Sequence, residues 1–444
     1  MRRIWSEHNK RLIWRILWVT LAEVESRWNL VTRDQVEDLK AHSTQIDLPK
    51  SVEIESVLKH DLMAEIKVFA SQCPVGGGII HLGATSMDIK DNAEVLQIRQ
   101  SIAVLEEKLK SLLMAFASLI HQTANLPVMA FTHLQPAEPT TLGYRFASAA
   151  QDLLEDYETL VEFKKNLRGK GFKGAVGNAA SFIELLGEEG FDDFEKQISE
   201  LIDLPFFQVA TQTYSRRQDF VLLSRLAGLA ASLSKFALDL RILQSQPIGE
   251  LSEPFGQEQV GSSAMPFKRN PVEAEKIDSL ARTVSVAPQI AWQNAANSIL
   301  ERTLDDSANR RTLLPETFLA LDEMIDTTSK IVTGIVINPK AIDRTLNTYA
   351  PFAGIERLMM VLVKKGADRQ KMHELLRAHS LDAWTAVNDG KPNPLKDDLG
   401  SDPELLSILS KEEIRLALDT DQYLGIAQKR TLELADRIKK TVGD

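Results

Sequence analysis

Apolar residues recur at every third or fourth position over long stretches of this chain. From Asn92 onward they keep this spacing as far as Ile120, which is the pattern of one long amphipathic helix. The same spacing recurs over residues 141 to about 167, 218 to about 245, 271 to about 301, and 313 to about 336. Helices of this length span about 40 Å, and five of them predict a helical bundle.

Alternating strand patterns are nearly absent. The best candidate is the segment VMAFTHLQ at residues 128–135, so the sequence predicts an all-α fold. Turn-forming residues at 73–78 (CPVGGG) and 337–339 (INP) mark the two ends of the long helices. They divide the chain into three predicted domains: a helical N-terminal domain at 1–85, a long-helix bundle at 86–337, and a helical C-terminal domain at 338–444.

Composition and charge restrict the cellular compartment, the cofactors and the partners that can be expected. Among 444 residues Cys73 is the only cysteine, which excludes an internal disulfide and favours a reducing, cytoplasmic setting. No Cys/His cluster has metal-ligand spacing, so no metal is expected. The apolar run from Leu12 to Leu21 is interrupted by Arg15 and predicts a core helix rather than a leader. The net charge of −10, with both signs interspersed, argues against broad contact with nucleic acid or membrane.

The segment GSSAMPFKRNP at 261–271 contains an unusually high number of polar side chains that could take part in catalysis or binding. It places two hydroxyls (Ser262, Ser263), two cations (Lys268 and its neighbour) and an amide (Asn270) between helix-breaking residues. Such a loop can close over an anionic substrate. A polar surface loop between two helices is the alternative interpretation.

Two of the eight histidines stand out by their context. His133 lies in the Pro- and Gly-punctuated segment FTHLQPAEPTTLG, and His60 lies between Lys59 and Asp61 at the start of an amphipathic stretch. Histidine titrates near neutral pH, so either residue could transfer a proton. His81 is expected to orient its own loop, and the remaining histidines are interpreted as structural.

Two further polar segments present groups that bind anions. HLGATSMDIKDN at 81–92 carries Thr85 and Ser86 just before the first long helix, although ordinary N-capping explains part of this pattern. The segment ERTLDDSANRR at 301–311 carries Arg302, Ser307 and Arg311, which could bind a phosphate or a carboxylate. The alternative interpretation is an exposed helix surface with salt bridges.

With these segments in view, the chain resembles the fumarase/aspartase superfamily of lyases and, within it, the adenylosuccinate lyase family. The motifs that carry the resemblance are GSSAMPFKRNP, HLGATS, FTHLQPA, TQTYSR and RTLDDSANRR, and the similarity extends to about residue 363. The resemblance implies a three-domain, mostly helical fold, a homotetramer built on a shared bundle, and active sites assembled from three subunits.

The resemblance also implies a reaction without a cofactor. Fumarate would be eliminated from succinyl-AMP, and from the succinylated imidazole carboxamide ribotide (SAICAR), a small-molecule nucleotide in each case. By resemblance Ser262 is the base, with Ser263 the alternative, and His133 is the acid. A serine needs help to lose its proton, and Lys268 would supply it.

The remaining roles are implied in the same way. The succinyl end would be held by Lys59, His60, Asp61, Thr85 and Ser86. The nucleotide and carboxylates would be bound by Gln212, Lys276, Arg302, Ser307 and Arg311, while Asn270 and Glu275 would support the loop and the histidine network.

The start of the chain departs from the family pattern. Relatives carry an arginine-tyrosine pair in a motif like RYxxxEM that helps to bind phosphate, and here Met1 matches the last position of that motif. We therefore expect either a start at an internal methionine or a different substrate. The alternative functions are another fumarate-releasing lyase of the superfamily and a non-catalytic structural protein on the same scaffold.

Overall fold

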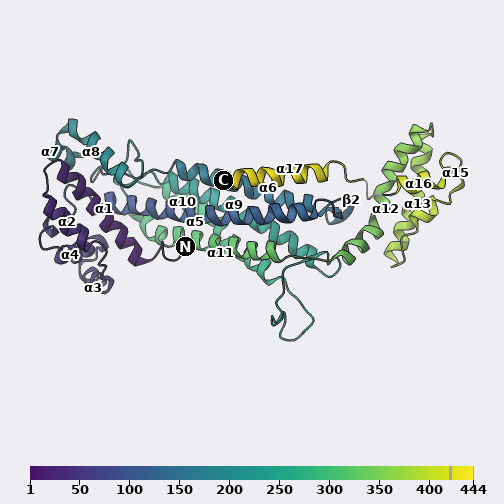
Figure 1. Cartoon of the computed structure of the whole chain (residues 1–444), viewed down its shortest axis with the longest axis horizontal. Helices are drawn as coiled ribbons and strands as arrows, with labels where there is room; N and C mark the ends of the chain where they lie inside the picture. Colours follow the sequence, from purple (N-terminus) through teal and green to yellow (C-terminus); the bar gives the residue numbers. More distant parts are fainter. Residues whose placement is uncertain (420–422, 444) are drawn as a thin grey trace. The chain divides into compact units, whose positions relative to one another are not determined.

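The computed structural model of the chain describes residues 1–419 and 423–443, and these are largely helical (Figure 1). The prediction of an all-α fold is confirmed. The five long helices are α5 (Ser86–Thr123), α6 (Leu142–Lys165), α9 (Arg217–Gln244), α10 (Val272–Ala296) and α11 (Asp305–Gly334). The N-terminal helices are α1 (Glu7–Arg27), α2 (Arg33–His42), α3 (Leu48–Leu58) and α4 (Asp61–Gln72), followed by the 3-10 helix η1 (Gly77–Ile79).

The remaining helices are shorter than the five long helices, apart from α12, which has 26 residues. They are α7 (Ala180–Leu186), α8 (Glu188–Leu201), α12 (Pro339–Lys364), α13 (Arg369–Asn388), α14 (Leu395–Leu399), α15 (Pro403–Leu406), α16 (Lys411–Ala417) and α17 (Ala427–Val442). The strands are β1 (Pro127–Thr132), β2 (Gln135–Thr141), β3 (Leu251–Ser252) and β4 (Val336–Ile337).

All five predicted long helices form, but two begin earlier than their apolar pattern does. Helix α5 starts at Ser86 rather than near Asn92, and α11 starts at Asp305 rather than near Leu313. In both, the first turns are polar because they face a cavity described below, so periodicity alone could not show them. The predicted strand segment is also confirmed, as β1 and β2 pair in an antiparallel hairpin.

The described chain divides into two compact units. Unit 1 comprises residues 1–108, 156–231 and 280–324, and unit 2 comprises residues 109–155, 232–279 and 325–444. Each of the five long helices contributes residues to both. The predicted three-domain division at residues 85 and 337 stays a prediction.

In unit 1 the predicted core helix is α1, whose Leu17 and Leu21 are buried. It packs on α2 and α8, and α3 packs on α4. Charged side chains tie the bundle helices together: Lys108 of α5 pairs with Asp322 of α11 at 2.6 Å, and Lys164 of α6 pairs with Glu106 of α5. The long helices of unit 1 therefore hold each other by polar as well as apolar contacts.

In unit 2 the bundle and the C-terminal helices have separate cores. Phe116 of α5 packs edge-on against Phe236 of α9, with ring centroids 5.3 Å apart. The C-terminal helices enclose an apolar cluster that includes Leu358, Leu376 and Leu399. Helix α12 also packs on the β1–β2 hairpin.

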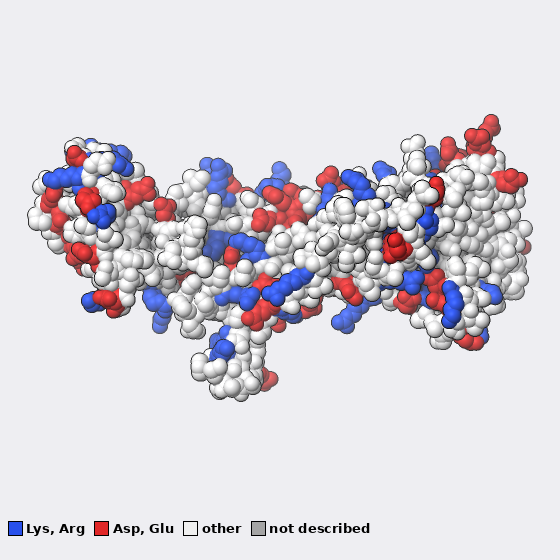
Figure 2. Space-filling view, turned by 180° about the vertical axis from the view of Figure 1, so that it is seen from behind, with Lys and Arg blue, Asp and Glu red and all other residues white. Residues whose placement is uncertain are grey.

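Helix α9 is long and apolar enough to cross a membrane by length and composition, yet it is a bundle helix with 44% of its apolar window buried inside the chain. On the molecular face shown in Figure 2, cationic and anionic side chains are interspersed. This mixed surface is expected, because the 52 cationic and 62 anionic residues are interspersed along the sequence.

Candidate active site

Unit 1 contains a polar cavity of about 520 Å³. Nine residues that the sequence analysis selected line it together, although they come from four separate stretches of the chain: Lys59, His60, Asp61, Thr85, Ser86, Gln212, Arg302, Ser307 and Arg311. A volume of this order is typical of small-molecule sites.

The junction of α3 and α4 forms one wall. Lys59 ends α3 in the left-handed conformation (φ 56°), and His60 is the N-cap of α4. The Nδ1 atom of His60 accepts a hydrogen bond from the backbone N–H of Met63 at 3.3 Å, so the neutral ring carries its proton on Nε2. That nitrogen lies 3.5 Å from the hydroxyl oxygen of Ser86. The helix cap therefore selects the tautomer that faces the cavity.

Asp61, the first residue of α4, is held in its ionised form. Burial alone would raise its pKa, but the Lys90 ammonium, 2.8 and 3.0 Å from the two carboxylate oxygens, brings the pKa below its ordinary value. Lys90 belongs to α5 and also lines the cavity. The sequence analysis missed it.

A largely buried network of charges forms part of the cavity wall. Arg216 is paired with Asp91 at 3.1 Å and with Asp306 at 2.7 Å, and Asp306 also accepts from Arg302 at 2.9 Å. Burial would raise the pKa of Asp306, yet the two guanidinium groups hold it below its ordinary value. This network fixes Arg302, one of the predicted binding residues, against the core.

A second arginine of the wall is neutralised in the same way. Arg310 pairs with Asp219 at 2.8 Å and with Glu94, and it donates to the hydroxyl of Tyr214 at 2.7 Å. Burial raises the pKa of Glu94 despite the neighbouring Arg310. The charges of Arg216 and Arg310 are therefore largely neutralised by carboxylates of the protein itself.

Two cations of the wall remain available. Within residues 1–419 and 423–443, neither Lys59 nor Arg311 makes an ion pair, and both side chains are exposed to solvent. The hydroxyls of Thr85, Ser86 and Ser307 line the same cavity. Unpaired cations beside hydroxyl groups suit an anionic ligand.

The other predicted residues belong to unit 2. His133 and Leu134 occupy the two-residue turn between β1 and β2, and both have positive φ (54° and 59°). Asn270 donates to the carbonyl oxygen of Gly261 at 3.1 Å and so closes the loop on itself. Ser262 accepts a hydrogen bond from the backbone N–H of Met265 at 3.1 Å.

The remaining predicted residues of unit 2 are Ser263 and Lys268 in the loop and Glu275 and Lys276 in α10. Within the described residues the hydroxyl of Ser263 and the ammonium of Lys268 make no hydrogen bond or ion pair, and both residues are exposed. Glu275 lies 3.7 Å from Arg241, and Lys276 pairs with Glu273 at 2.7 Å on the first turns of α10.

The loop that carries Ser262 ends at an anchor on α10. The buried carboxylate of Glu253 accepts hydrogen bonds from the backbone N–H groups of Glu273 at 3.2 Å and Ala274 at 3.2 Å. Gln244 accepts from the backbone N–H of Glu253 at 2.9 Å and donates to the carbonyl oxygen of Arg269 at 3.2 Å. Both ends of the segment 253–272 are therefore fixed, although its middle is exposed.

Sequence reasoning did not assign a role to several cavity residues. They are Lys10, Trp14, Glu55, Met87, Lys90, Asp91, Glu94, Gln97, Arg216, Leu304 and Arg310. One signal was present: charged residues at 88, 90, 91 and 94 interrupt the start of an otherwise apolar helix, and buried charges need partners elsewhere in the chain.

The chain is similar to known lyases over most of its length. The sequence profile described as "Lyase" matches residues 30–285, and the profile described as "Adenylosuccinate lyase C-terminus" matches residues 352–433. The adenylosuccinate lyase of Saccharomyces cerevisiae is 35% identical over 97% of this chain and 90% of its own length. That of Pyrococcus abyssi is 33% identical over 97% of this chain and 93% of its own length.

Solved structures show the same fold. A fumarate lyase from Mesorhizobium superposes with a TM-score of 0.86 at 23% identity, covering 98% of this chain and 97% of its own. The 3-carboxy-cis,cis-muconate lactonizing enzyme from Pseudomonas putida superposes with a TM-score of 0.86 at 25% identity, covering 99% of this chain and 97% of its own. From its sequence profile, its relatives and its fold, the chain belongs to the adenylosuccinate lyase family of carbon–nitrogen lyases.

Proposed function

We propose that this chain eliminates fumarate from succinyl-AMP, and from SAICAR, in purine biosynthesis. The observation that supports this most directly is the cavity of unit 1, in which the unpaired cations Lys59 and Arg311 stand beside the hydroxyls of Thr85, Ser86 and Ser307. Both substrates carry a phosphate and two carboxylates, so such a cavity matches their charge.

In this proposal the cavity binds and orients the substrate. The side-chain N–H on Nε2 of His60 points toward Ser86, where the two groups can bind one carboxylate together. Arg302 is held by Asp306 and offers its remaining N–H groups to the ligand. These contacts are equally available to substrate and transition state, so they contribute mainly to binding.

The chemical step is assigned to residues of unit 2. Ser262, or Ser263 in its place, takes the proton from the carbon beside a carboxylate. The electron pair of that C–H bond forms the double bond of fumarate as the carbon–nitrogen bond breaks, and His133 gives a proton to the leaving amine. Lys268 stabilises the serine alkoxide and the developing negative charge.

The test is an ultraviolet assay of succinyl-AMP cleavage by the purified chain. We expect turnover of succinyl-AMP and SAICAR and none of argininosuccinate or aspartate. Cleavage of a control substrate in place of succinyl-AMP would assign the chain to another lyase, and inactivity toward all four compounds would favour a non-catalytic protein.

We further propose a cytoplasmic homotetramer, with each active site assembled from three subunits. Bundle helices carry exposed apolar side chains that a second copy would cover, among them Met114, Leu238, Val286 and Trp292. His133→Gln should be inactive because it lacks the proposed acid. His60→Gln should be inactive at substrate concentrations near the wild-type Michaelis constant, because it no longer binds substrate. Refolding the two variants together should restore part of the activity. No recovery, with tetramers verified by light scattering, would contradict shared sites.

A further inference from the structure

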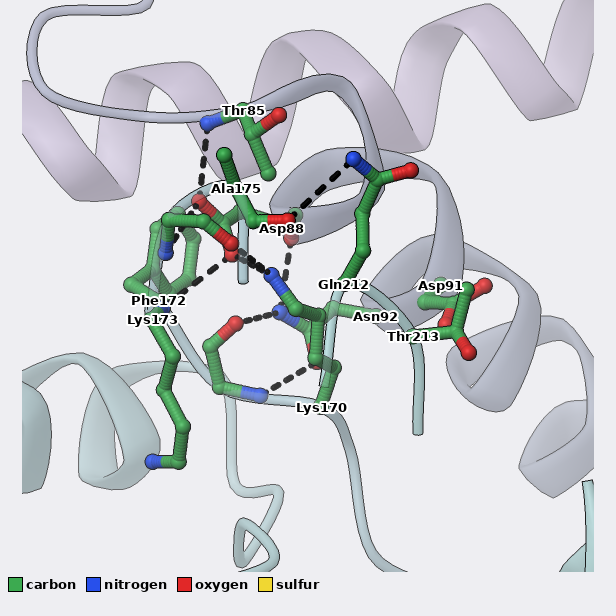
Figure 3. A network of polar contacts seen from close by, with 12 residues as sticks. Thr85, Asp88, Asp91, Asn92, Lys170, Phe172, Lys173, Ala175, Gln212 and Thr213 are labelled. Atoms are coloured by element: carbon green, nitrogen blue, oxygen red, sulfur yellow. Dashed lines mark hydrogen bonds and ion pairs between the residues drawn. The ribbon is translucent and has the colours of Figure 1, made fainter. Parts of the chain in front are cut away.

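One buried carboxylate near the cavity collects an unusual number of donors. Asp88, on the first turn of α5, accepts from the ammonium of Lys170 and from three backbone N–H groups: Thr85 at 2.8 Å, Lys173 at 3.1 Å and Gly174 at 3.2 Å (Figure 3). Asp88 and Lys170 are both 0% exposed. A single carboxylate therefore joins the start of α5 to the segment 170–174, which follows α6.

The segment 170–174 is fixed against α5 by more than this ion pair. Lys170 also donates to the carbonyl oxygen of Gly174 at 2.9 Å. One turn along α5, Asn92 accepts from the backbone N–H of Gly171 and donates to its carbonyl oxygen, both at 3.1 Å. Gly171 has φ 84°, a conformation that glycine adopts without strain. The two segments consequently behave as one rigid body.

This rigid body carries substrate-binding groups on two sides. Thr85, whose N–H is held by Asp88, precedes Ser86, and both line the cavity. Gln212, another cavity residue, donates from Nε2 to the carbonyl oxygen of Ala175 at 3.2 Å, directly after the fixed segment (Figure 3). The ion pair itself does not line the cavity.

We propose that Asp88 and Lys170 are a positioning pair for the substrate site. The pair fixes Thr85 and Ser86 on one side of the cavity and Gln212 on the other, so it acts on substrate only through these residues. This inference rests on the proposed function, because it assigns those three side chains to substrate binding.

Lys170→Met is the variant that tests the pair, since it removes the ammonium and keeps an unbranched side chain only one atom shorter. We expect the Michaelis constant for succinyl-AMP to rise about tenfold while kcat changes less than threefold, as for interactions shared by ground and transition states. Lys170→Arg, which keeps the charge, should recover part of the affinity.

The double variant Asp88→Asn, Lys170→Met separates positioning from simple stability. It removes the unpaired buried charge, so it should be more thermally stable than Lys170→Met alone. Its Michaelis constant should nevertheless stay high, because an amide offers one acceptor oxygen and turns its NH₂ group toward backbone N–H donors. A purely structural pair would show recovery of both properties together.

Glu106→Gln is the matched control. It disturbs the Glu106–Lys164 pair, which joins α6 to α5 and, like Asp88–Lys170, involves no residue that lines the cavity. Hydrogen–deuterium exchange at residues 82–87 and 210–213 gives a readout independent of turnover, and it should be faster in Lys170→Met than in wild type or Glu106→Gln.

Equal Michaelis constants and equal exchange in Lys170→Met and Glu106→Gln would overturn the positioning pair. A wild-type chain without activity on succinyl-AMP would refute the proposed function instead. In that case the exchange experiment would still decide whether Lys170 holds the two segments.

Discussion

The cavity wall of unit 1 and the serine loop of unit 2 are built in opposite ways. The wall is stabilised by buried ion pairs, such as those of Arg216 with Asp91 and Asp306. The loop places Ser262 between two fixed ends, and its apolar Val260 and Phe267 are 79% and 83% exposed. One region is held in a single arrangement before any ligand arrives, while the other is anchored only where it begins and ends.

Under the proposed function, this difference separates binding from chemistry. A preformed wall lowers the entropy that a ligand loses when it binds. A loop with few internal contacts can change conformation and expel water once the ligand is present. Substitutions in the wall should therefore change affinity, and substitutions in the loop should change the rate of the chemical step.

The largest expected effect is that of Ser262→Ala. Removing the base should lower kcat by about 10²- to 10⁴-fold, the usual contribution of a general acid or base, while AMP affinity stays within about threefold. Steady-state assays and calorimetric titration with AMP measure the two quantities. Ser263→Ala is the control, and if it alone proves inactive, the base is Ser263.

Glu253→Ala should have an intermediate effect. It leaves the N–H groups of Glu273 and Ala274 without their acceptor, so the end of the loop loses its anchor. We expect kcat to fall about tenfold and stability to fall by about 0.5 to 2 kcal/mol, as for the loss of a helix cap.

Asp368→Ala is the matched control for that variant. Asp368 caps α13 by accepting from the N–H groups of Gln370 and Lys371 in the same unit, away from the loop in sequence. Urea titrations should show a similar loss of stability in both variants. An equal loss of kcat in both would show that anchoring the loop has no role of its own.

The smallest effect on activity is expected for Glu25→Gln, in α1 of unit 1. Glu25 is 1% exposed, both its carboxylate oxygens lack a hydrogen-bond partner among the described residues, and burial raises its pKa from 4.5 to about 8. Between these two values the folded protein binds a proton that the unfolded chain releases. Wild-type stability should therefore fall as the pH rises from about 4.5 to 8.

The Glu25→Gln variant should lose this contribution to the pH dependence and gain roughly 1 to 3 kcal/mol at pH 8, with turnover unchanged. Urea unfolding at pH 5, 6.5 and 8 measures the change. Identical slopes of stability against pH in the two proteins would show that Glu25 does not titrate in this range.

The bundle could be predicted from sequence because its signal is local. Apolar residues spaced three or four positions apart located all five long helices to within a few residues of their ends. The exceptions are the starts of α5 and α11, whose first turns are polar. Two compact units that share the long helices could not be foreseen, since that division depends on contacts between distant segments.

The cavity was predictable in part for a similar reason. Segments with several polar groups, such as Lys59 to Asp61, contain eight of the nine predicted lining residues, and the ninth, Gln212, was expected only from the resemblance to the lyase family. Lys90 in the wall, and Asp88 outside it, could not be assigned a role because each depends on a partner far away in sequence, Asp61 or Lys170 respectively. Partners of this kind become visible only once the chain is folded.

The turn that holds His133 has a consequence for protein engineering. Two-residue hairpin turns with two positive φ angles favour asparagine followed by glycine, whereas here the residues are histidine and leucine. A procedure that optimises stability would rewrite this turn and remove the proposed acid. Thermostable variants of this chain should therefore be selected with the tip of the hairpin held constant, because at this position the sequence favoured by folding differs from the one that the proposed mechanism needs.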